Sequence, residues 1–281
     1  MRVLVTGASG FVGSYVTTFC PAHYQVHPLG RKSILNGTVA DLITLTVEDF
    51  VALFSHQAIE GIIHLAAEAN ISHCEHAQEA HALNVGVTER LVSAARQTGL
   101  PILFASTDQV FSGDEGHLFE STPPNPCHQY GQQKLEAEQV VLDYAKGLVL
   151  RLPLVLGRHS NGRGSLEAML NQGGKEGVLH LFVDEFRRPI HAMDAAKAFW
   201  AAFQWEPGVY HISGPELMSR VEIAQAILPA LQEKSITILP TSLKDQSFGY
   251  KRPHCLDLVT SKQEVKDLRV ELFQNHIDEV A

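Results

Sequence analysis

The sequence has 281 residues, which is long enough to bury a sizeable hydrophobic core. Hydrophobic residues make up 45% and charged residues 19%, as in an ordinary globular protein, so a disordered chain is excluded. The formal net charge of -9 argues against a non-specific nucleic-acid-binding protein, which would need an excess of Lys and Arg. We find no signal-peptide pattern and no uninterrupted apolar stretch of about 18 residues, and therefore expect a soluble cytoplasmic protein without a membrane partner.

The chain begins with a short β-branched run, residues 2–6, which predicts a buried parallel strand. Gly7, Gly10 and Gly13 follow at once, and residues 11–19 predict a helix. In this context Gly7 permits a tight turn, Gly10 lets the backbone approach a pyrophosphate, and Gly13 lets helix and strand pack closely. The helix N-terminus supplies free N–H groups for phosphates. We therefore predict a dinucleotide site, with a ligand-free glycine turn as the alternative; the segment also contains Ser9, Phe11 and Val12.

The second predicted strand, about residues 25–29, ends in the basic pair Arg31 and Lys32. NAD enzymes usually carry an acidic residue at this point, which binds the ribose 2′-hydroxyl, and none is present here. Arg31 and Lys32 instead suit a 2′-phosphate, because guanidinium and ammonium groups pair with it. We therefore favour NADP(H) over NAD(H). The alternative is a solvated basic loop.

Further along the chain, several residues suit contacts with the rest of a dinucleotide. Asp41 and Leu42 follow the next predicted strand and are expected near the adenine. Small residues after the strand at 61–65 let the backbone lie against the cofactor, and this segment contains Leu65, Ala66 and Ala67. Asn84 is a polar residue between apolar neighbours in a predicted helix that covers residues 77–98.

The predicted strand at 102–105 runs into Ser106, Thr107 and Asp108. A strand followed by a helix places such residues at the carboxyl edge of a parallel sheet, where ligands bind. About two dozen residues later, Tyr130 and Lys134 lie one helical turn apart on the same face of a helix predicted to run to about residue 146.

This pair suits proton transfer beside a nicotinamide. A phenol has an ordinary pKa near 10, and a neighbouring ammonium group favours its ionised form. In a reduction, Tyr130 gives its proton to a carbonyl oxygen while hydride arrives at the carbon, and Thr107 hydrogen-bonds the same oxygen. Tyr-x-x-x-Lys alone is a weak motif. Its weight comes from the glycine turn and from the Ser-Thr-Asp at a strand end.

At this point the chain resembles the extended short-chain dehydrogenase/reductases, and more narrowly the dTDP-4-dehydrorhamnose reductase branch. The resemblance covers nearly the whole chain and is strongest in STDQVF and in the segment around Tyr130 and Lys134. The segments that carry it are TGASGFVG (6–13), HLAA (64–67), STDQVFSGDEG (106–116), PPNPCHQYGQQKLEAE (123–138), LRLPLVLG (150–157), RRPIHAMDAA (187–196) and RPHCLDLVTSK (252–262).

The resemblance implies that Thr107, Tyr130 and Lys134 form the catalytic set and that Lys134 also touches the nicotinamide ribose. It further implies a cofactor role for Asn84 and places Arg252 over the substrate. Arg151 and Pro153 are expected near the nicotinamide.

The resemblance implies NADPH-dependent reduction of a 4-keto sugar nucleotide. Gln109 departs from the family pattern, in which the residue after Ser-Thr-Asp is usually Tyr. Dehydratases use a Glu at this position as a base, and Gln109 cannot do this, which argues against dehydration. The alternatives are an epimerase of the same superfamily and a non-catalytic NADP-binding regulatory subunit, like that of methionine adenosyltransferase. A homodimer is suggested by family analogy alone.

We expect an α/β fold with a Rossmann-type doubly wound parallel sheet and a smaller C-terminal substrate-binding lobe. The dinucleotide-binding domain is predicted over residues 1–156, with segments near 187–213 returning to it. The lobe is predicted over residues 157–186 and 214–281. Predicted substrate contacts are Thr107, Asp108, Arg163 and Arg252, although Arg163 suits a solvated loop better.

No metal is predicted. The histidines and the cysteine between residues 73 and 76 are spaced too tightly for an ordinary zinc site and lack a second pair. The chain has four cysteines without a Cys-x-x-Cys pair, and we expect them to be reduced and mostly buried. His64 is expected to be a hydrogen-bonded core histidine.

Overall fold

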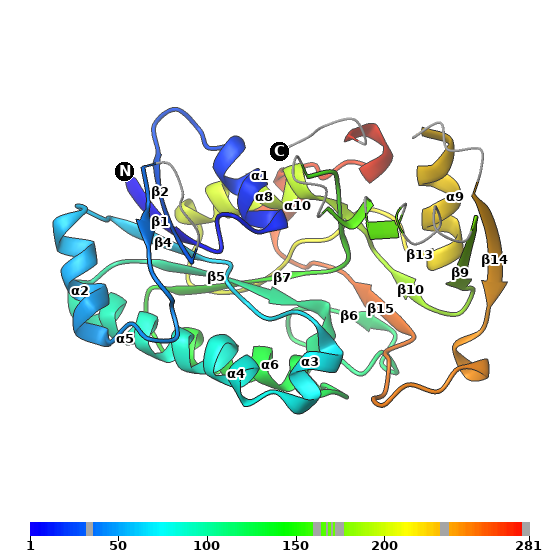
Figure 1. Cartoon of the computed structure of the whole chain (residues 1–281). Coiled ribbons are helices and arrows are strands. Elements are labelled where there is room, and N and C mark those ends of the chain that lie inside the picture. Colours follow the sequence, from blue (N-terminus) through cyan, green and yellow to red (C-terminus); the bar gives the residue numbers. More distant parts are fainter. Residues whose placement is uncertain are drawn as a thin grey trace.

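The computed structural model describes residues 1–31, 36–159, 164–166, 168, 169, 171, 177–230 and 236–276. A seven-stranded parallel sheet forms the centre of the molecule, with the strand order β12-β7-β5-β4-β1-β2-β3 (Figure 1). Its strands are β1 (Arg2–Thr6), β2 (Gln25–Gly30), β3 (Thr38–Val39), β4 (Gly61–His64), β5 (Ile102–Thr107), β7 (Gly147–Leu152) and β12 (Gly208–His211). The prediction of a doubly wound parallel sheet is confirmed.

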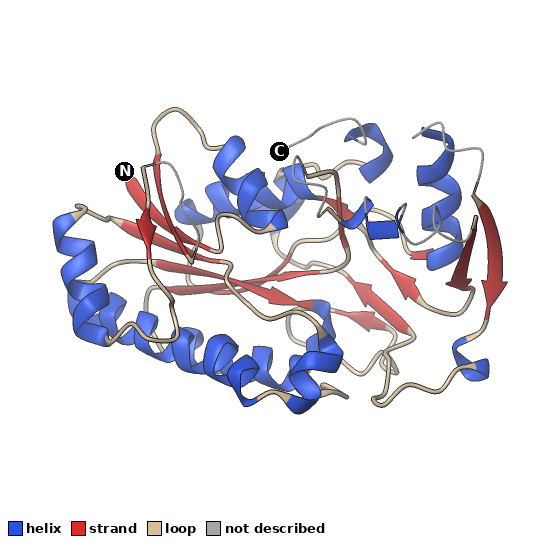
Figure 2. Cartoon of the chain, in the orientation of Figure 1, coloured by secondary structure: helices blue, strands red, loops and turns tan. Residues whose placement is uncertain are grey.

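Helices cover both faces of this sheet, as Figure 2 shows. One face carries α1 (Phe11–Thr18) and α8 (Ala192–Ala201), and the other carries α2 (Val47–His56), α5 (Val87–Thr98) and α6 (Gln129–Leu142). Each layer buries its own hydrophobic cluster against the sheet, so the strands are apolar on both faces. The strand order reverses between β1 and β4, and this reversal opens a crevice at the carboxyl ends of the strands.

Local sequence signals explain where several helices begin and end. Thr46 caps α2 and forms a reciprocal capping box with Asp49. Gly99 ends α5 in the left-handed conformation, with a φ of 71°. His128 caps α6, which ends at Leu142, earlier than the sequence pattern predicted. The predicted long helix over residues 77–98 is interrupted by a π-helical turn, and its parts are α4 (Gln78–His81), the π-turn Ala82–Gly86 and α5.

The rest of the described chain forms smaller sheets beside the carboxyl end of the large one. A four-stranded sheet contains β6 (His117–Leu118), β10 (Phe186–Arg187), β13 (Met218–Ser219) and β15 (Cys255–Leu258). Two strand pairs are β8 (Val155–Leu156) with β11 (Ile190–His191) and β9 (Val178–Phe182) with β14 (Thr237–Thr241). The remaining helices are α3 (Ile71–His76), α9 (Arg220–Ala230) and α10 (Gln263–Asp267), with short 3-10 turns at Asp108–Val110, Ala202–Gln204, Leu243–Asp245 and Phe273–His276.

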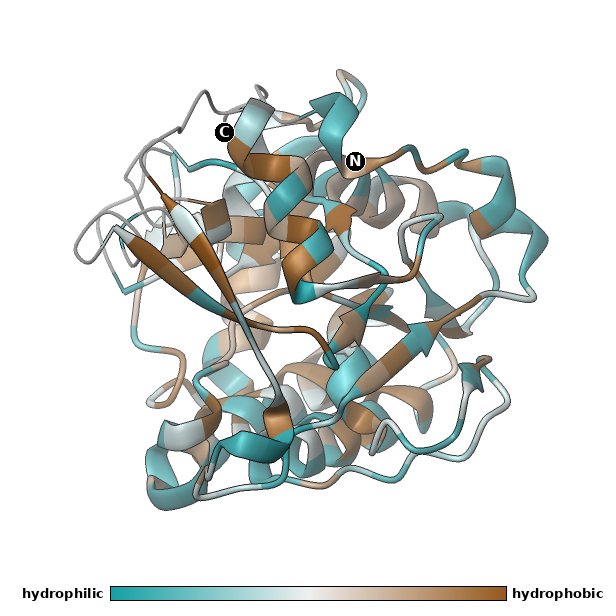
Figure 3. Cartoon of the chain, turned by 90° about the vertical axis from the view of Figure 1, so that its right-hand side faces the viewer, coloured by the Kyte–Doolittle hydropathy of each residue, from teal (hydrophilic) through white to brown (hydrophobic). Residues whose placement is uncertain are grey.

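Figure 3 views this smaller part from the side of β9, β14 and α9, where hydrophobic and hydrophilic residues alternate on the helix. The hydrophobic side of α9 packs through Ile223 and Ile227 against Leu156, Leu166 and Phe273. The segment at 208–211 pairs with β7 in the large sheet, whereas β6 pairs with β15 in the smaller one. The predicted domain boundaries stay a prediction. No helix in the described part of the chain is long and apolar enough to cross a membrane.

Candidate functional site

Two cavities lie at the carboxyl ends of the parallel strands. The first, which we call the glycine cavity, has a volume of about 630 Å³ and lies beyond β1, β2 and β4. The second, the arginine cavity, has a volume of about 360 Å³ and lies beyond β5 and β7. Both positions are those at which open α/β sheets bind their ligands.

The glycine cavity contains most of the residues that the sequence predicted for a dinucleotide. Its predicted lining residues are Gly7, Ser9, Gly10, Arg31, Asp41, Leu42, Leu65, Ala66 and Ala67, joined by Gly30, Ile43 and Leu83. The predicted residues Phe11, Val12, Gly13, Asn84, Tyr130 and Lys134 are not among its described lining residues. Lys32 lies outside the described residues.

Gly7 lies in the wall of the glycine cavity, and Gly13 packs against it from α1. Gly7 has a φ of 69°, and a Cβ there would lie 2.8 Å from the backbone nitrogen of Ala66. A Cβ on Gly13 would lie 2.2 Å from the carbonyl oxygen of Gly7, which explains why α1 packs so closely on the turn. The cavity wall is therefore bare backbone next to a helix N-terminus, which suits a pyrophosphate.

His64 fixes the end of β4 beside this cavity. Its Nδ1 lies 2.7 Å from the hydroxyl of Thr6 and its Nε2 lies 3.1 Å from the hydroxyl of Thr88. The Thr6 hydroxyl in turn accepts a hydrogen bond from the backbone N–H of Leu65. Burial, together with the positive charge of Lys134, lowers the pKa of His64 to about 3. The prediction of a hydrogen-bonded core histidine is confirmed.

Asn84 is buried in the π-helical turn and links two segments of the site. Its Nδ2 donates to the carbonyl oxygen of Glu68 at 3.0 Å and to Oε1 of Gln133 at 2.8 Å, and its Oδ1 accepts from the backbone N–H of Glu68. The side chain thus ties the loop after β4 to α6, the helix that carries Tyr130 and Lys134.

Thr107 and Tyr130 come together in the wall of the arginine cavity. Thr107 ends β5 and Tyr130 lies in the first turn of α6, so residues 23 positions apart in the chain share one cavity. Lys134 is buried behind them. Its Nζ donates to the carbonyl oxygen of Ala105 at 2.6 Å and lies 3.8 Å from the ring centroid of Phe104.

The protonation of this pair differs from what the sequence suggested. Burial raises the pKa of Tyr130 above its ordinary value, the negative charge of Asp108 adds to the rise, and a hydrogen bond with Thr107 opposes it. Burial lowers the pKa of Lys134 to about 7, against the opposing charge of Glu138. Tyr130 is therefore a neutral phenol and a proton donor, and the expectation that Lys134 favours the ionised phenol stays a prediction.

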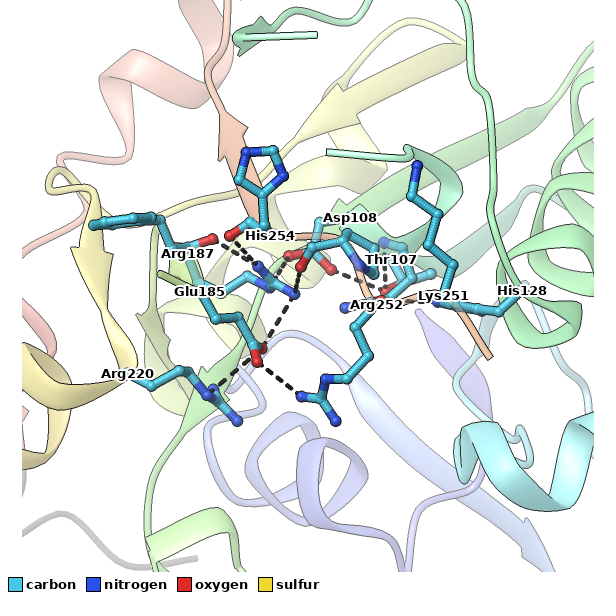
Figure 4. A network of polar contacts seen from close by, with 12 residues as sticks. Thr107, Asp108, His128, Glu185, Arg187, Arg220, Lys251, Arg252 and His254 are labelled. Atoms are coloured by element: carbon cyan, nitrogen blue, oxygen red, sulfur yellow. Dashed lines mark hydrogen bonds and ion pairs between the residues drawn. The ribbon is translucent and has the colours of Figure 1, made fainter. Parts of the chain in front are cut away.

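Three arginines and a glutamate form the opposite side of the arginine cavity (Figure 4). Glu185 is buried and lies within ion-pair distance of all three guanidinium groups. The distances from its carboxylate oxygens are 3.2 Å to Nη2 of Arg187, 3.7 Å to Nε of Arg220 and 2.9 Å to Nη2 of Arg252. One carboxylate therefore holds three cations around the cavity.

Asp108 is the second carboxylate of this cavity and is 2% exposed. Its Oδ1 accepts a hydrogen bond from the Thr107 hydroxyl at 3.2 Å. Its Oδ2 lies 3.7 Å from Nε of Arg187, within ion-pair range, and accepts no hydrogen bond from the described residues. Burial raises the pKa of Asp108 to about 6, although Arg187 opposes the rise.

The structure thus brings together Thr107, Asp108 and Arg252 as the sequence predicted, while Arg163 lies outside the described residues. Arg151 does not line the arginine cavity and instead forms a buried ion pair with Glu138, at 2.6 Å. Sequence reasoning missed Glu185, Arg187 and Arg220. For Glu185 and Arg187 the signal in the sequence was the charged stretch after residue 183, which is flanked by apolar residues, and Arg220 had none.

Within the described residues, no group of three or more His, Cys, Asp or Glu side chains is arranged to hold a metal ion. All four cysteines are free. Only Cys74 is buried, and Cys20, Cys127 and Cys255 are intermediate, so the expectation of mostly buried thiols is wrong.

Comparison with known proteins finds a matching family model, relatives in sequence and similar solved structures. The family model described as RmlD substrate binding domain matches residues 1–281. A methionine adenosyltransferase 2 subunit beta from Danio rerio is 30% identical over 98% of this chain and 88% of its own length. The dTDP-4-dehydrorhamnose reductase structure from Clostridium acetobutylicum superposes with a TM-score of 0.83 at 21% identity, covering 98% of this chain and 96% of that one. A dTDP-4-dehydrorhamnose reductase from Bacillus anthracis in complex with NADP gives a TM-score of 0.82 at 22% identity, with the same coverage.

Proposed function

The chain belongs to the RmlD substrate binding domain family, and on this premise we propose that it catalyses NADPH-dependent reduction of a 4-keto sugar attached to a nucleoside diphosphate. The observation that carries the proposal is that the proton donor Tyr130 shares one cavity with three arginines. Guanidinium groups pair with phosphate oxygens in a fixed geometry, so this cavity suits a diphosphate beside a reactive carbonyl.

The glycine cavity fits a nicotinamide dinucleotide. Gly7 and Gly13 leave no room for a Cβ, and the backbone next to the N-terminus of α1 is open to phosphates. Arg31 lines the cavity and would bind the 2′-phosphate of NADP(H). No acidic residue follows the end of β2 that would repel this phosphate. Structural neighbours that contain NADP or NAD support a nicotinamide dinucleotide, and Arg31 is the reason for preferring NADP(H).

When bound, NADPH would supply hydride to the carbonyl carbon. Tyr130 would donate its phenolic proton to the carbonyl oxygen, and its raised pKa keeps that proton in place at neutral pH. Thr107 would donate a hydrogen bond to the same oxygen. Lys134, one helical turn further along α6, would stabilise the phenolate that remains.

The test is oxidation of NADPH by the purified protein in the presence of dTDP-4-dehydrorhamnose, with Tyr130→Phe as the matched control. We expect turnover in the wild type and its loss in the variant, with NADPH binding retained by both. Binding of NADPH without turnover of any ketosugar nucleotide would overturn the proposal. Turnover of a sugar nucleotide with no net NADPH consumption would point to an epimerase instead.

A second candidate function is regulatory. It is favoured by the 30% identity to the beta subunit of methionine adenosyltransferase 2, over nearly the full chain. In that case the protein would bind the dinucleotide and a catalytic methionine adenosyltransferase without chemistry of its own. Co-purification with such a synthetase, together with absence of NADPH oxidation, would favour this function over the reductase.

A further inference from the structure

The charges around the arginine cavity do not balance. Three guanidinium groups face two carboxylates, which leaves one uncompensated positive charge. Glu185 is shared by all three arginines, whereas Asp108 faces only Arg187, at 3.7 Å. The two carboxylates therefore differ in how many guanidinium groups lie within ion-pair distance of them.

Asp108 is also the carboxylate with an unused oxygen. Its Oδ2 accepts no hydrogen bond from any residue in the described ranges, although the side chain is almost fully buried. A buried carboxylate oxygen without a hydrogen-bond donor is unfavourable. The protonated form changes this oxygen from an unsatisfied acceptor into a donor on a residue that lines the cavity.

A diphosphate ester brings two negative charges into this cavity. If Asp108 stays ionised, the ligand and the five side chains together carry one net negative charge in a partly buried site. If Asp108 takes up a proton, the positive charges of the three arginines are balanced by Glu185 and the diphosphate. Low-dielectric surroundings penalise the first arrangement, because like charges repel more strongly there than in water.

We propose that Asp108 takes up a proton from solvent when a nucleoside diphosphate sugar binds in the arginine cavity, and that the resulting carboxylic acid donates a hydrogen bond to the substrate beside Thr107. The inference rests on the proposed substrate class. Asp108 and the substrate would compete for one hydrogen atom, because the Thr107 hydroxyl donates to Asp108. A neutral carboxyl is a weaker acceptor, which frees that hydroxyl for the substrate oxygen.

The groups that face Asp108 agree with this assignment. Arg187 favours the ionised form, and Glu185 on the same segment opposes it. Tyr130 on α6 is a neutral phenol, and Arg220 at the start of α9 acts from further away. With burial as the largest effect, the pKa of Asp108 is about 6, so a small additional negative charge is enough to make it take up a proton at neutral pH.

The remaining neighbours do not compensate the added charge. Arg252, on the segment before β15, is paired with Glu185 at 2.9 Å. His128 is buried at the start of α6 and hydrogen-bonds Gln109, and burial lowers its pKa, so it stays neutral.

The test is isothermal titration calorimetry of dTDP-glucose and of UDP-glucose with the NADP-saturated protein. Both probes have an esterified diphosphate that does not titrate near neutrality. Measurement at pH 7 in buffers with different enthalpies of ionisation gives the number of protons taken up per ligand bound. We expect close to one proton at pH 7, because Asp108, with a pKa of about 6, is mostly ionised there before the ligand binds, and a clearly smaller number at pH 5.

Two variants make the assignment specific. Asp108→Asn supplies an N–H donor at every pH and is expected to bind the probe without proton uptake. Asp114→Asn removes an exposed carboxylate that pairs with Lys251 outside the cavity, and is expected to keep the uptake of the wild type. Thermal unfolding of both variants shows whether they are folded.

Each outcome decides the inference. Binding without proton uptake in the wild type would overturn it and leave the proposed reductase function intact. Uptake that persists in Asp108→Asn would assign the proton to another group. If neither sugar nucleotide binds, the proposed substrate class fails, and this inference fails with it. NADPH oxidation is a separate measurement, so the two failures are distinguishable.

Discussion

The glycine cavity is bounded mainly by backbone and apolar side chains, whereas charged side chains line one whole side of the arginine cavity. Most residues that line the glycine cavity come from short segments that directly follow β1, β2 and β4. The second combines the end of β5 with residues from β10, α9 and the segment before β15, which are far apart in the chain.

This difference separates two kinds of recognition. A glycine turn at a helix N-terminus binds phosphates through the backbone and does not depend on protonation. A cluster of arginines and carboxylates binds through charge, so its affinity depends on pH, on salt and on each partner in the cluster. We therefore expect substitutions at the two cavities to have effects that can be told apart.

The largest effect is expected for Tyr130→Phe. Loss of the proton donor should lower kcat for ketosugar reduction by about 10²- to 10⁴-fold, the usual contribution of a general acid. The dissociation constant for NADPH should stay within about twofold, because Tyr130 does not line the glycine cavity. Steady-state kinetics and fluorescence titration of NADPH measure the two quantities. A variant with wild-type kcat would remove Tyr130 from the reaction.

Acidification should lower the stability of the folded protein through two buried histidines, His64 and His211. Burial lowers the pKa of His64, near the glycine cavity, to about 3 and that of His211, on β12, to about 4. Both imidazoles are neutral in the folded protein and become protonated in the unfolded chain below about pH 6.5, so stability is lost as the pH falls from there. Each contributes a slope of up to about 1.4 kcal/mol per pH unit.

Urea unfolding at several pH values measures this slope. His64→Asn, which keeps a hydrogen-bonding side chain, should have a shallower dependence between pH 6.5 and 5 than the wild type. Identical slopes for the two proteins would show that His64 is not held in its neutral form.

A smaller effect is expected at Gly13, which packs against Gly7 beside the glycine cavity. Gly13→Ala places a Cβ at 2.2 Å from the carbonyl oxygen of Gly7. The resulting overpacking should cost about 1–3 kcal/mol, more than the roughly 1 kcal/mol by which Ala is the better helix former. Gly249→Ala is the matched control, since a Cβ there has no neighbour within 4 Å. Chemical denaturation measures both, and equal stability of the two variants would contradict the account.

The smallest effect is expected at the arginine cavity and should change only the KM for the sugar nucleotide. Arg220→Gln removes one of the three guanidinium groups and should raise KM for the sugar nucleotide about tenfold, equivalent to one charge-assisted hydrogen bond. KM for NADPH should not change. Arg96→Gln, which breaks an exposed pair with Asp143, is the control and should leave both constants unchanged. A rise of KM for NADPH in Arg220→Gln would show that the cavities do not act separately.

The same contrast explains how much could be predicted from the sequence. Gly7, Gly10 and Gly13 were informative because a backbone phosphate site is encoded in one contiguous strand-turn-helix segment. Thr107 and Tyr130 could be paired because both lie at predictable ends of neighbouring elements. Arg187 and Arg220 could not be placed, since only the fold brings their segments to the end of β5.

Electrostatics was the other gap. Spacing predicted that Lys134 and Tyr130 lie on one helical face, but not that burial would raise the pKa of the phenol. The contact between Lys134 and the carbonyl oxygen of Ala105 was equally invisible, because it depends on how closely α6 packs on β5. Desolvation is a property of the packed protein and has no local sequence signal.

The most direct test of the reductase function uses NADPH that carries deuterium on the transferring position of the nicotinamide ring. After incubation with dTDP-4-dehydrorhamnose, mass spectrometry of the sugar nucleotide shows where the label is. Our account predicts one deuterium per molecule of reduced sugar in the wild type, and formation of the same labelled product about 10²- to 10⁴-fold more slowly with Tyr130→Phe. An unlabelled, unreduced sugar nucleotide in the presence of bound NADPH would contradict it.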